Sequence, residues 1–160
     1  MDTHSIPFSS RTEFQNLALQ CLGRAEQGIQ LFDPNFLSWN LGSLETNAIL
    51  RQFLISKQTN RLQLAMHDTL HIERECPRFI SLLRDFSHAI ECRVTPRTLH
   101  QLTDSFCMAD GKHIVRRFHC DHFRGAATWD SEPDCNISSQ RFSAMWEEST
   151  IGLHATTLGL

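Results

Sequence analysis

The chain has 160 residues, of which 41% are hydrophobic and 21% charged, and 15 basic against 18 acidic side chains give a formal net charge of −3. This composition is close to the average of globular proteins and far from that of disordered chains. The charge balance excludes a broad basic field, so any site for an anion must be local. The apolar runs are much shorter than the ~20 residues of a membrane span, so we expect no membrane partner.

The amino-terminal segment and the cysteines indicate the compartment in which the protein works. Residues 1–9 lack the basic and apolar regions of a signal peptide, and we expect them to form a flexible arm before a single domain over residues 10–160. The six cysteines contain no C-x-x-C pair, so a zinc ribbon or a thioredoxin motif is not indicated. They are most simply small buried hydrophobes in a reducing compartment, and we therefore expect a cytoplasmic protein.

The first half of the chain alternates helical and strand patterns. Ser10 and Glu13 have the spacing of a capping box, and apolar residues then recur at helical spacing as far as Ala25, with Gly28 as the stop. The elements expected next are a strand at 29–32, a packed loop at 35–42, a helix at 44–57 capped by Ser43, a strand at 61–66 and a third helical region around 77–86.

The second half is richer in strand patterns. Strands are expected at 90–94, 105–109, 112–120 and 126–129, followed by a loop at 130–136, a helix at 138–149 and an apolar tail at 151–160. Asp110-Gly111 is a strong signal for a two-residue hairpin. Early alternation of helices and strands predicts parallel strands, while the hairpin makes the sheet mixed. The expected fold class is α/β, a mixed central sheet covered by helices.

This order of elements, together with the segment Phe106–Val115, resembles one half of a phospholipase D-like fold. Several short segments also resemble an uncharacterised bacterial domain family that occurs beside, or fused to, GNAT-type acetyltransferases; they are Phe32-Asp33-Pro34, Asn40–Ser43, Leu83–His88 and Ile114–Asp121. The second resemblance spans nearly the whole chain. It implies a bacterial origin and an acetyltransferase-family partner, and it brings no known activity.

The phospholipase D motif is incomplete in this chain. Catalytic members carry a histidine nucleophile, a lysine two residues later, an aspartate five residues after the lysine, and Gly-Ser seven residues beyond the aspartate. With the aspartate aligned on Asp110, the histidine and lysine positions hold Thr103 and Ser105, and Arg117-Phe118 replaces Gly-Ser. Without a nucleophile the phosphodiesterase mechanism is unavailable, so the resemblance implies a degenerate, non-catalytic half with no catalytic residue.

Binding of an anion is therefore the main functional hypothesis. Strand alternation in 112–121 puts Arg116 and Arg117 on opposite faces, so whichever face is buried contains a guanidinium. A buried guanidinium needs an anion, which is either an internal carboxylate or the phosphate or carboxylate of a small-molecule ligand. The internal candidates are Asp33, Asp68, Asp104 and Asp110. The expected ligand-binding residues are Arg116, Arg117, His67, Asp68, His119 and Asp110, of which Asp110 is a turn residue and the two histidines and Asp68 line the strand-end cleft.

Two further hypotheses remain open from the residues alone. One is a metal-dependent hydrolase built on His119, Asp121, His122 and His67, although neighbouring strand residues point in opposite directions and no metal or cofactor is part of the main hypothesis. The other is a partner-binding domain, or a homodimer, in which the tail and Trp39, Trp129 and Trp146 make the contacts.

Overall fold

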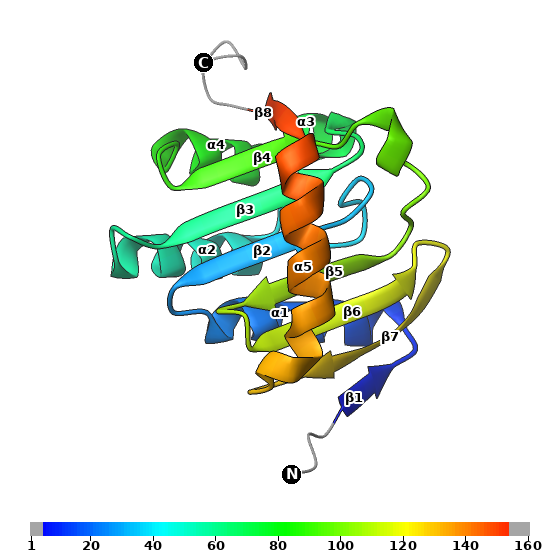
Figure 1. The fold of residues 1–160 in the computed structure, drawn as a ribbon. Coiled ribbons are helices and arrows are strands. Elements are labelled where there is room, and N and C mark those ends of the chain that lie inside the picture. Colours follow the sequence, from blue (N-terminus) through cyan, green and yellow to red (C-terminus); the bar gives the residue numbers. More distant parts are fainter. Residues whose placement is uncertain (1–4, 154–160) are drawn as a thin grey trace.

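The computed structural model describes residues 5–153 and contains one eight-stranded mixed sheet with helices on both faces (Figure 1). The strands are β1 (Ser5–Phe8), β2 (Gly28–Phe32), β3 (Arg61–Met66), β4 (Ile90–Val94), β5 (Ser105–Ala109), β6 (His113–His119), β7 (His122–Thr128) and β8 (Thr150–Leu153). The helices are α1 (Arg11–Arg24), α2 (Leu44–Ser56), α3 (Leu70–Glu75), α4 (Pro77–Asp85) and α5 (Glu132–Glu148), with a 3-10 turn η1 (Arg97–Leu99). The expected α/β class is confirmed.

The strand order in the sheet is β1-β7-β6-β5-β2-β3-β4-β8. The central strands β2, β3 and β4 are parallel, and all the other pairs are antiparallel. The carboxyl ends of β2, β3 and β4 therefore meet the start of β5 and the end of β6 at one edge, on the right of Figure 1. The segments 33–43, 95–104 and 119–122 all turn at this edge, which we call the strand-end edge.

Both faces of the sheet are covered, and each has its own hydrophobic core. Helices α1, α2 and α4 lie behind the sheet in Figure 1, where Phe14 and Leu31 belong to the larger core, and α5 crosses in front, where Phe32 and Phe142 belong to the smaller one. Leu31 and Phe32 are neighbours in β2 and both are fully buried, as expected for a central strand between two layers of helices. The odd positions of β6, such as Val115, face the α1 layer, while Ile114 faces α5.

Serine residues are the N-caps of the three long helices, α1, α2 and α5. The Oγ atoms of Ser10, Ser43 and Ser131 accept hydrogen bonds from the backbone amides three residues later, at 3.2, 3.1 and 3.4 Å. The first two caps are as expected from the sequence. The third is a correction, because α5 begins at Glu132 and includes most of the segment expected to be a loop. Pro133 lies in the first turn of α5, where a proline leaves no hydrogen bond unmade.

The amino-terminal arm is also corrected in part. Residues 5–8 form the edge strand β1, which pairs antiparallel with the second half of β7, and only residues 1–4 of the expected arm lie outside the described part. A glycine makes the pairing of β1 with β7 possible, because a Cβ at Gly125 would lie 1.8 Å from the carbonyl oxygen of Arg116 and 2.5 Å from the Phe8 ring. The third helical region expected around 77–86 is α4, with Pro77 in its first turn, and a short helix that was not expected, α3, precedes it and is divided from it at Cys76.

Two further expectations concern the tail and the cysteines. The start of the tail forms β8 on β4, whereas residues 154–160 lie outside the described residues. Five of the cysteines are buried and Cys120 is partly exposed, which agrees with their expected role as small hydrophobes. Within residues 5–153 no helix is long and apolar enough to cross a membrane.

The Asp110-Gly111 hairpin is confirmed. It lies at the end of β5, away from the strand-end edge, and its role is structural. Both residues have positive φ, 58° and 67°. The Asp110 carboxylate accepts hydrogen bonds from the backbone amides of Glu26, Gln27 and Gly28 at 2.9, 2.8 and 3.0 Å. It thereby ties the β5–β6 turn to the link between α1 and β2.

We expect Asp110→Ala to lower the free energy of unfolding by about 2–4 kcal/mol, because three charge-assisted hydrogen bonds are lost and alanine is strained at positive φ. Asp110→Asn should cost less, since its amide oxygen still accepts and asparagine tolerates this conformation. Urea unfolding followed by circular dichroism measures both. Asp85→Ala, which removes an exposed ion pair with Arg51, is the control; an equal loss in this variant would contradict the assigned role of Asp110.

Candidate functional site

A buried carboxylate organises the strand-end edge. Asp33 follows β2 directly and is 3% exposed. Its oxygens accept hydrogen bonds from the backbone amides of Asn35 and Phe36 (2.9 and 2.6 Å), from Trp39 Nε1 (2.9 Å) and from Ser105 Oγ (2.5 Å). Four donors compensate for the lost hydration of the carboxylate. They also fix the loop after β2 and the first residue of β5.

A buried guanidinium lies on the same face of the sheet. Arg117 in β6 is 5% exposed, and it donates from Nε to the carbonyl oxygen of His122 (2.8 Å) and from Nη2 to that of Cys120 (2.5 Å). Its Cζ lies 4.1 Å from the centre of the Phe123 ring and 5.8 Å from that of Phe14. Burial lowers the pKa of Arg117, although the nearby negative charge of Asp33 opposes this effect. The guanidinium is thus held by neutral carbonyl groups and aromatic faces.

Arg117 forms no ion pair with a carboxylate of the described residues 5–153. Ser105, its partner in the β5–β6 register, instead donates to Asp33. The expected alternative of an internal salt bridge from this arginine to Asp33, Asp68, Asp104 or Asp110 is therefore not what the structure shows. The prediction that one of the tandem arginines is buried is correct, and that one is Arg117.

A hollow of about 500 Å³ opens beside the two arginines. It is lined by Gln101, Leu102, Thr103, Asp104, Arg116, Arg117 and Phe118, and we call it the arginine hollow. Arg116 is exposed, with its Cζ 5.5 Å from the centre of the Phe118 ring, which is itself 53% exposed. The one carboxylate in the lining is that of Asp104, which Arg141 binds through both oxygens at 2.7 and 2.8 Å. The uncompensated charge of the lining is therefore positive.

His67 and Asp68 line a second hollow of about 480 Å³ at the same edge. The Nε2 atom of His67 lies 2.8 Å from the carbonyl oxygen of Leu102 and its Nδ1 atom 2.5 Å from Thr95 Oγ1. Since a carbonyl only accepts, Nε2 carries the proton and Nδ1 accepts from the threonine hydroxyl. Asp68 accepts from the backbone amide of Leu70 at the start of α3 (2.8 Å). Both side chains thus hold local structure.

The structure brings the expected site residues together only in part. Arg116 and Arg117 share one hollow, and His67 and Asp68 share another, with the segment 94–104 contributing to both. His119 lies at the end of β6 and lines neither hollow, and Asp110 is at the opposite end of the strands. The strand-end cleft expected for the two arginines, His67, Asp68 and His119 is therefore divided, whereas Asp110 is the turn residue that the sequence predicts. Strand positions that share an edge still differ in the face on which their side chains lie.

The metal-hydrolase set is not assembled either. His67 has both ring nitrogens engaged with Thr95 and Leu102, away from the β6–β7 turn. At that turn, His119 and Asp121 are close together, with Nδ1 and Oδ2 3.6 Å apart, and the ring of His122 lies 6.0 Å from that of His119. A four-ligand site that includes His67 is therefore not formed in this structure.

Sequence reasoning missed several residues that define the site. The hydrogen bond from Ser105 to Asp33, the Asp104–Arg141 pair and the exposed ring of Phe118 were not assigned to it. Of these only Phe118 carried a usable signal, because it follows the two arginines at the end of a strand. The other contacts join residues 72 and 37 positions apart, and no local pattern indicates them.

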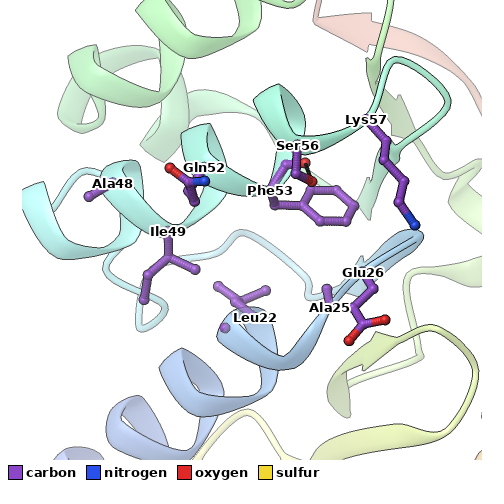
Figure 2. Close-up of a pocket in the computed structure, with 10 residues that line it drawn as sticks. Leu22, Ala25, Glu26, Ala48, Ile49, Gln52, Phe53, Ser56 and Lys57 are labelled. Atoms are coloured by element: carbon purple, nitrogen blue, oxygen red, sulfur yellow. Dashed lines mark hydrogen bonds between the residues drawn. The ribbon is translucent and has the colours of Figure 1, made fainter.

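Another hollow, of about 520 Å³, lies between the carboxyl-terminal halves of α1 and α2 (Figure 2). It is near the starts of β2 and β3, at the end of these strands that is opposite the strand-end edge. Its wall is mainly apolar, with Leu22, Ile49 and Phe53 in the groove and Glu26 and Lys57 at the end where the helices finish. Nothing in the structure shows what covers it. It offers no converging polar groups comparable with those of the arginine hollow.

The chain has the fold of the phospholipase D family. It superposes on Nuc from Salmonella typhimurium, a phospholipase D family member, with a TM-score of 0.64 at 12% identity, covering 94% of this chain and 99% of that one. For NucT from Helicobacter pylori the TM-score is 0.62 at 10% identity, with 95% and 100% covered. An archaeal chromatin protein, TrmBL2, gives 0.68 at 10% identity over 95% of this chain but 55% of its own length. The chain thus spans about half of that DNA-binding protein.

A family model described as Domain of unknown function (DUF7931) matches residues 10–154, and the chain belongs to this family. No curated protein matches the sequence. At identities of 10–12%, the solved structures establish the fold and leave the function to the residues of this chain.

The acid sensitivity of the fold tests the assigned state of His67. Burial lowers the pKa of His67 below the 6.5 of a free side chain, although the Leu102 carbonyl opposes the shift. The unfolded chain then binds the proton more tightly, so the contribution of neutral His67 to stability is complete above pH 6.5 and is lost as the pH falls through 6.5 towards the folded pKa. We expect His67→Gln to reduce the loss of stability between about pH 7.5 and 5.5.

Urea midpoints across this range provide the measurement. His113, whose pKa burial also lowers, stays in both proteins, so the comparison isolates His67. His88→Gln, which changes an exposed histidine, is the control and should keep the wild-type pH dependence. The same acid-induced loss in His67→Gln as in the wild type would exclude the neutral, partly buried state of His67.

Proposed function

We propose that this domain is a non-catalytic binding module for an anionic ligand that carries a phosphate group, held in the arginine hollow by Arg116 and Arg117. The observation that supports the proposal most directly is the buried guanidinium of Arg117, which forms no ion pair with a carboxylate within residues 5–153. Arg117 is also one of the residues that line the arginine hollow. Arg116 adds a second guanidinium from the neighbouring strand position.

The energetic basis is the cost of burying a charge. A guanidinium taken out of water is destabilising unless an anion or several acceptors compensate for the lost hydration. Arg141, at the same edge, has such an anion, and its hydrogen bonds to Asp104 raise its pKa. The hydrogen-bond partners of Arg117 are neutral, and burial lowers its pKa, although the nearby charges of Asp33 and Asp121 oppose this shift. A phosphate oxygen beside Arg117 would give it a direct anionic partner, and the planar guanidinium suits such a ligand.

The absence of catalysis is inferred from two positions in the motif. Thr103 and Ser105 occupy the places of the histidine and lysine of catalytic phospholipase D relatives. Ser105 is fully buried and donates to Asp33, and the Thr103 carbonyl accepts from the Cys120 amide at 2.7 Å. Neither residue supplies an activated nucleophile for attack on phosphorus.

The fold comparisons support a ligand of this chemistry. TrmBL2 is described as binding DNA, which is a polymer of phosphodiesters. The net charge of −3 argues against an extended basic groove in this chain, so a phosphate bound at one local site is the simpler proposal.

The remaining expectations about partners stay predictions. The cytoplasmic location, the bacterial origin and the acetyltransferase-family partner depend on sequence patterns alone. For the homodimer, the tryptophans give little support, because each has internal partners. Trp39 donates to Asp33, Trp129 lies under Arg24 at 4.5 Å, and Trp146 stacks on Phe142.

Titration with inorganic phosphate, followed by calorimetry or NMR, tests the binding proposal. We expect Arg116→Gln to weaken phosphate binding at least about tenfold, as the loss of one charge-assisted hydrogen bond should. Arg117→Gln should weaken phosphate binding further, but this variant also loses the hydrogen bonds that hold the β6–β7 turn. The Arg116→Gln variant is therefore the one that tests the proposal. The control is Arg84→Gln on α4, which should bind as the wild type does. Unchanged affinity in a folded Arg116→Gln protein would refute the proposal.

The non-catalytic assignment has its own test. The wild-type protein should release no more nitrophenolate from bis(p-nitrophenyl) phosphate than the Arg116→Gln protein does, because the lining of the hollow contains no activated nucleophile. Turnover that disappears in Thr103→Ala or Ser105→Ala would show that these residues do chemistry, and the domain would then be an enzyme.

A further inference from the structure

The β6–β7 turn brings three different metal-ligating groups together outside the arginine hollow. His119 ends β6, and Cys120 and Asp121 form the turn. One ligand atom from each lies within 4.8 Å of the others. The Nδ1 atom of His119 is 3.6 Å from Asp121 Oδ2, and the Sγ atom of Cys120 is 3.9 Å from Asp121 Oδ1.

We propose that this turn is a binding site for a divalent transition-metal ion of the zinc type, with His119, Cys120 and Asp121 as its protein ligands. Zinc accepts imidazole nitrogen, thiolate sulfur and carboxylate oxygen. Tetrahedral bonds of about 2.0 Å to nitrogen and oxygen and about 2.3 Å to sulfur place neighbouring ligand atoms roughly 3.3–3.6 Å apart. The 3.6 Å from His119 Nδ1 to Asp121 Oδ2 and the 3.9 Å from Cys120 Sγ to Asp121 Oδ1 are close to these values, and all three ligand atoms lie within 4.8 Å of one another, so small side-chain movements would bring them around one ion.

The backbone of the turn is held in one conformation by hydrogen bonds from and to distant segments. Arg117 donates to the carbonyl oxygens of Cys120 and His122, and the Cys120 amide donates to the Thr103 carbonyl. A turn held at both ends loses less conformational freedom when an ion binds. The side chains still have to adjust, because the Asp121 amide now donates to His119 Nδ1 at 3.1 Å and would return to water.

The ligand set leaves a fourth position open at the surface. His119 and Asp121 are exposed, and the ring of His122 is 6.0 Å from that of His119, centre to centre. Two imidazoles on one tetrahedral zinc have centres roughly 5 Å apart, so His122 or a water molecule could complete the coordination. Burial raises the pKa of Cys120, and the negative charge of Asp121 adds to the effect. Zinc would therefore displace a thiol proton when it binds.

This site differs from the metal-hydrolase hypothesis of the sequence. It uses Cys120, which that hypothesis omitted, and it leaves out His67, whose nitrogens are engaged elsewhere. No reaction is assigned to the ion. The site is also separate from the arginine hollow, although Arg117 contributes to both by holding the turn.

Titration of the untagged chain with Co²⁺ tests the site, because a thiolate ligand gives cobalt a characteristic charge-transfer absorption. We expect this band to saturate at one equivalent and to disappear when Zn²⁺ is added. Cys120→Ser should abolish the band, and His119→Ala and Asp121→Asn should each weaken binding at least about tenfold. Circular dichroism verifies that each variant is folded. None of the three changes a buried side chain.

His88→Ala, which removes an exposed histidine far along the chain from the turn, is the matched control and should bind cobalt as the wild type does. Absence of the band at one equivalent, or an unchanged band in Cys120→Ser, would refute the metal site. Neither result bears on phosphate binding, which is measured without metal, so the two proposals fail independently.

Discussion

The strand-end edge depends on how two opposite charges are buried without touching each other. Asp33 and Arg117 lie on the α1 face of the sheet, and Ser105 connects them, since it donates to Asp33 and is the register partner of Arg117. The carboxylate is satisfied by four donors, two of them backbone amides of the loop that follows it. The guanidinium is satisfied by two carbonyls of the β6–β7 turn. Each charge therefore organises the loop next to it.

This division of partners explains why the edge is both rigid and open. A direct ion pair between Asp33 and Arg117 would satisfy both charges and leave little for a ligand to gain. Instead, the carboxylate accepts four hydrogen bonds from the protein, whereas the guanidinium donates to neutral carbonyl groups and lies against an aromatic ring, with no carboxylate of residues 5–153 in direct contact. The loops at the strand-end edge are thus held in place by hydrogen bonds to these two side chains. If the proposed anion binds there, little of its binding energy is spent on ordering side chains.

The fold is that of the phospholipase D family, but the residues at the relevant positions perform structural tasks. Ser105 stabilises a buried carboxylate, Thr103 accepts from the β6–β7 turn, and Asp110 ties two loops together at the far end of the strands. These residues therefore contribute to the stability of the strand-end edge and of the β5–β6 turn. Since the fold alone does not assign a function, the function of this DUF7931 domain must be sought in the side chains at the strand-end edge.

Local sequence determined a large part of this protein. Helical spacing and serine caps predicted α1 and α2, alternation predicted the central strands, and Asp110-Gly111 predicted the hairpin, because each of these signals acts within a few residues. Alternation also predicted that one of two adjacent arginines is buried. Only the tertiary structure decided that Arg117 is the buried arginine and which groups it contacts. It also decided the division of the expected cleft into two hollows and the pairing of β1 with β7. These features depend on which segments meet across the sheet, because distant neighbours set the burial and hydrogen bonding of a side chain.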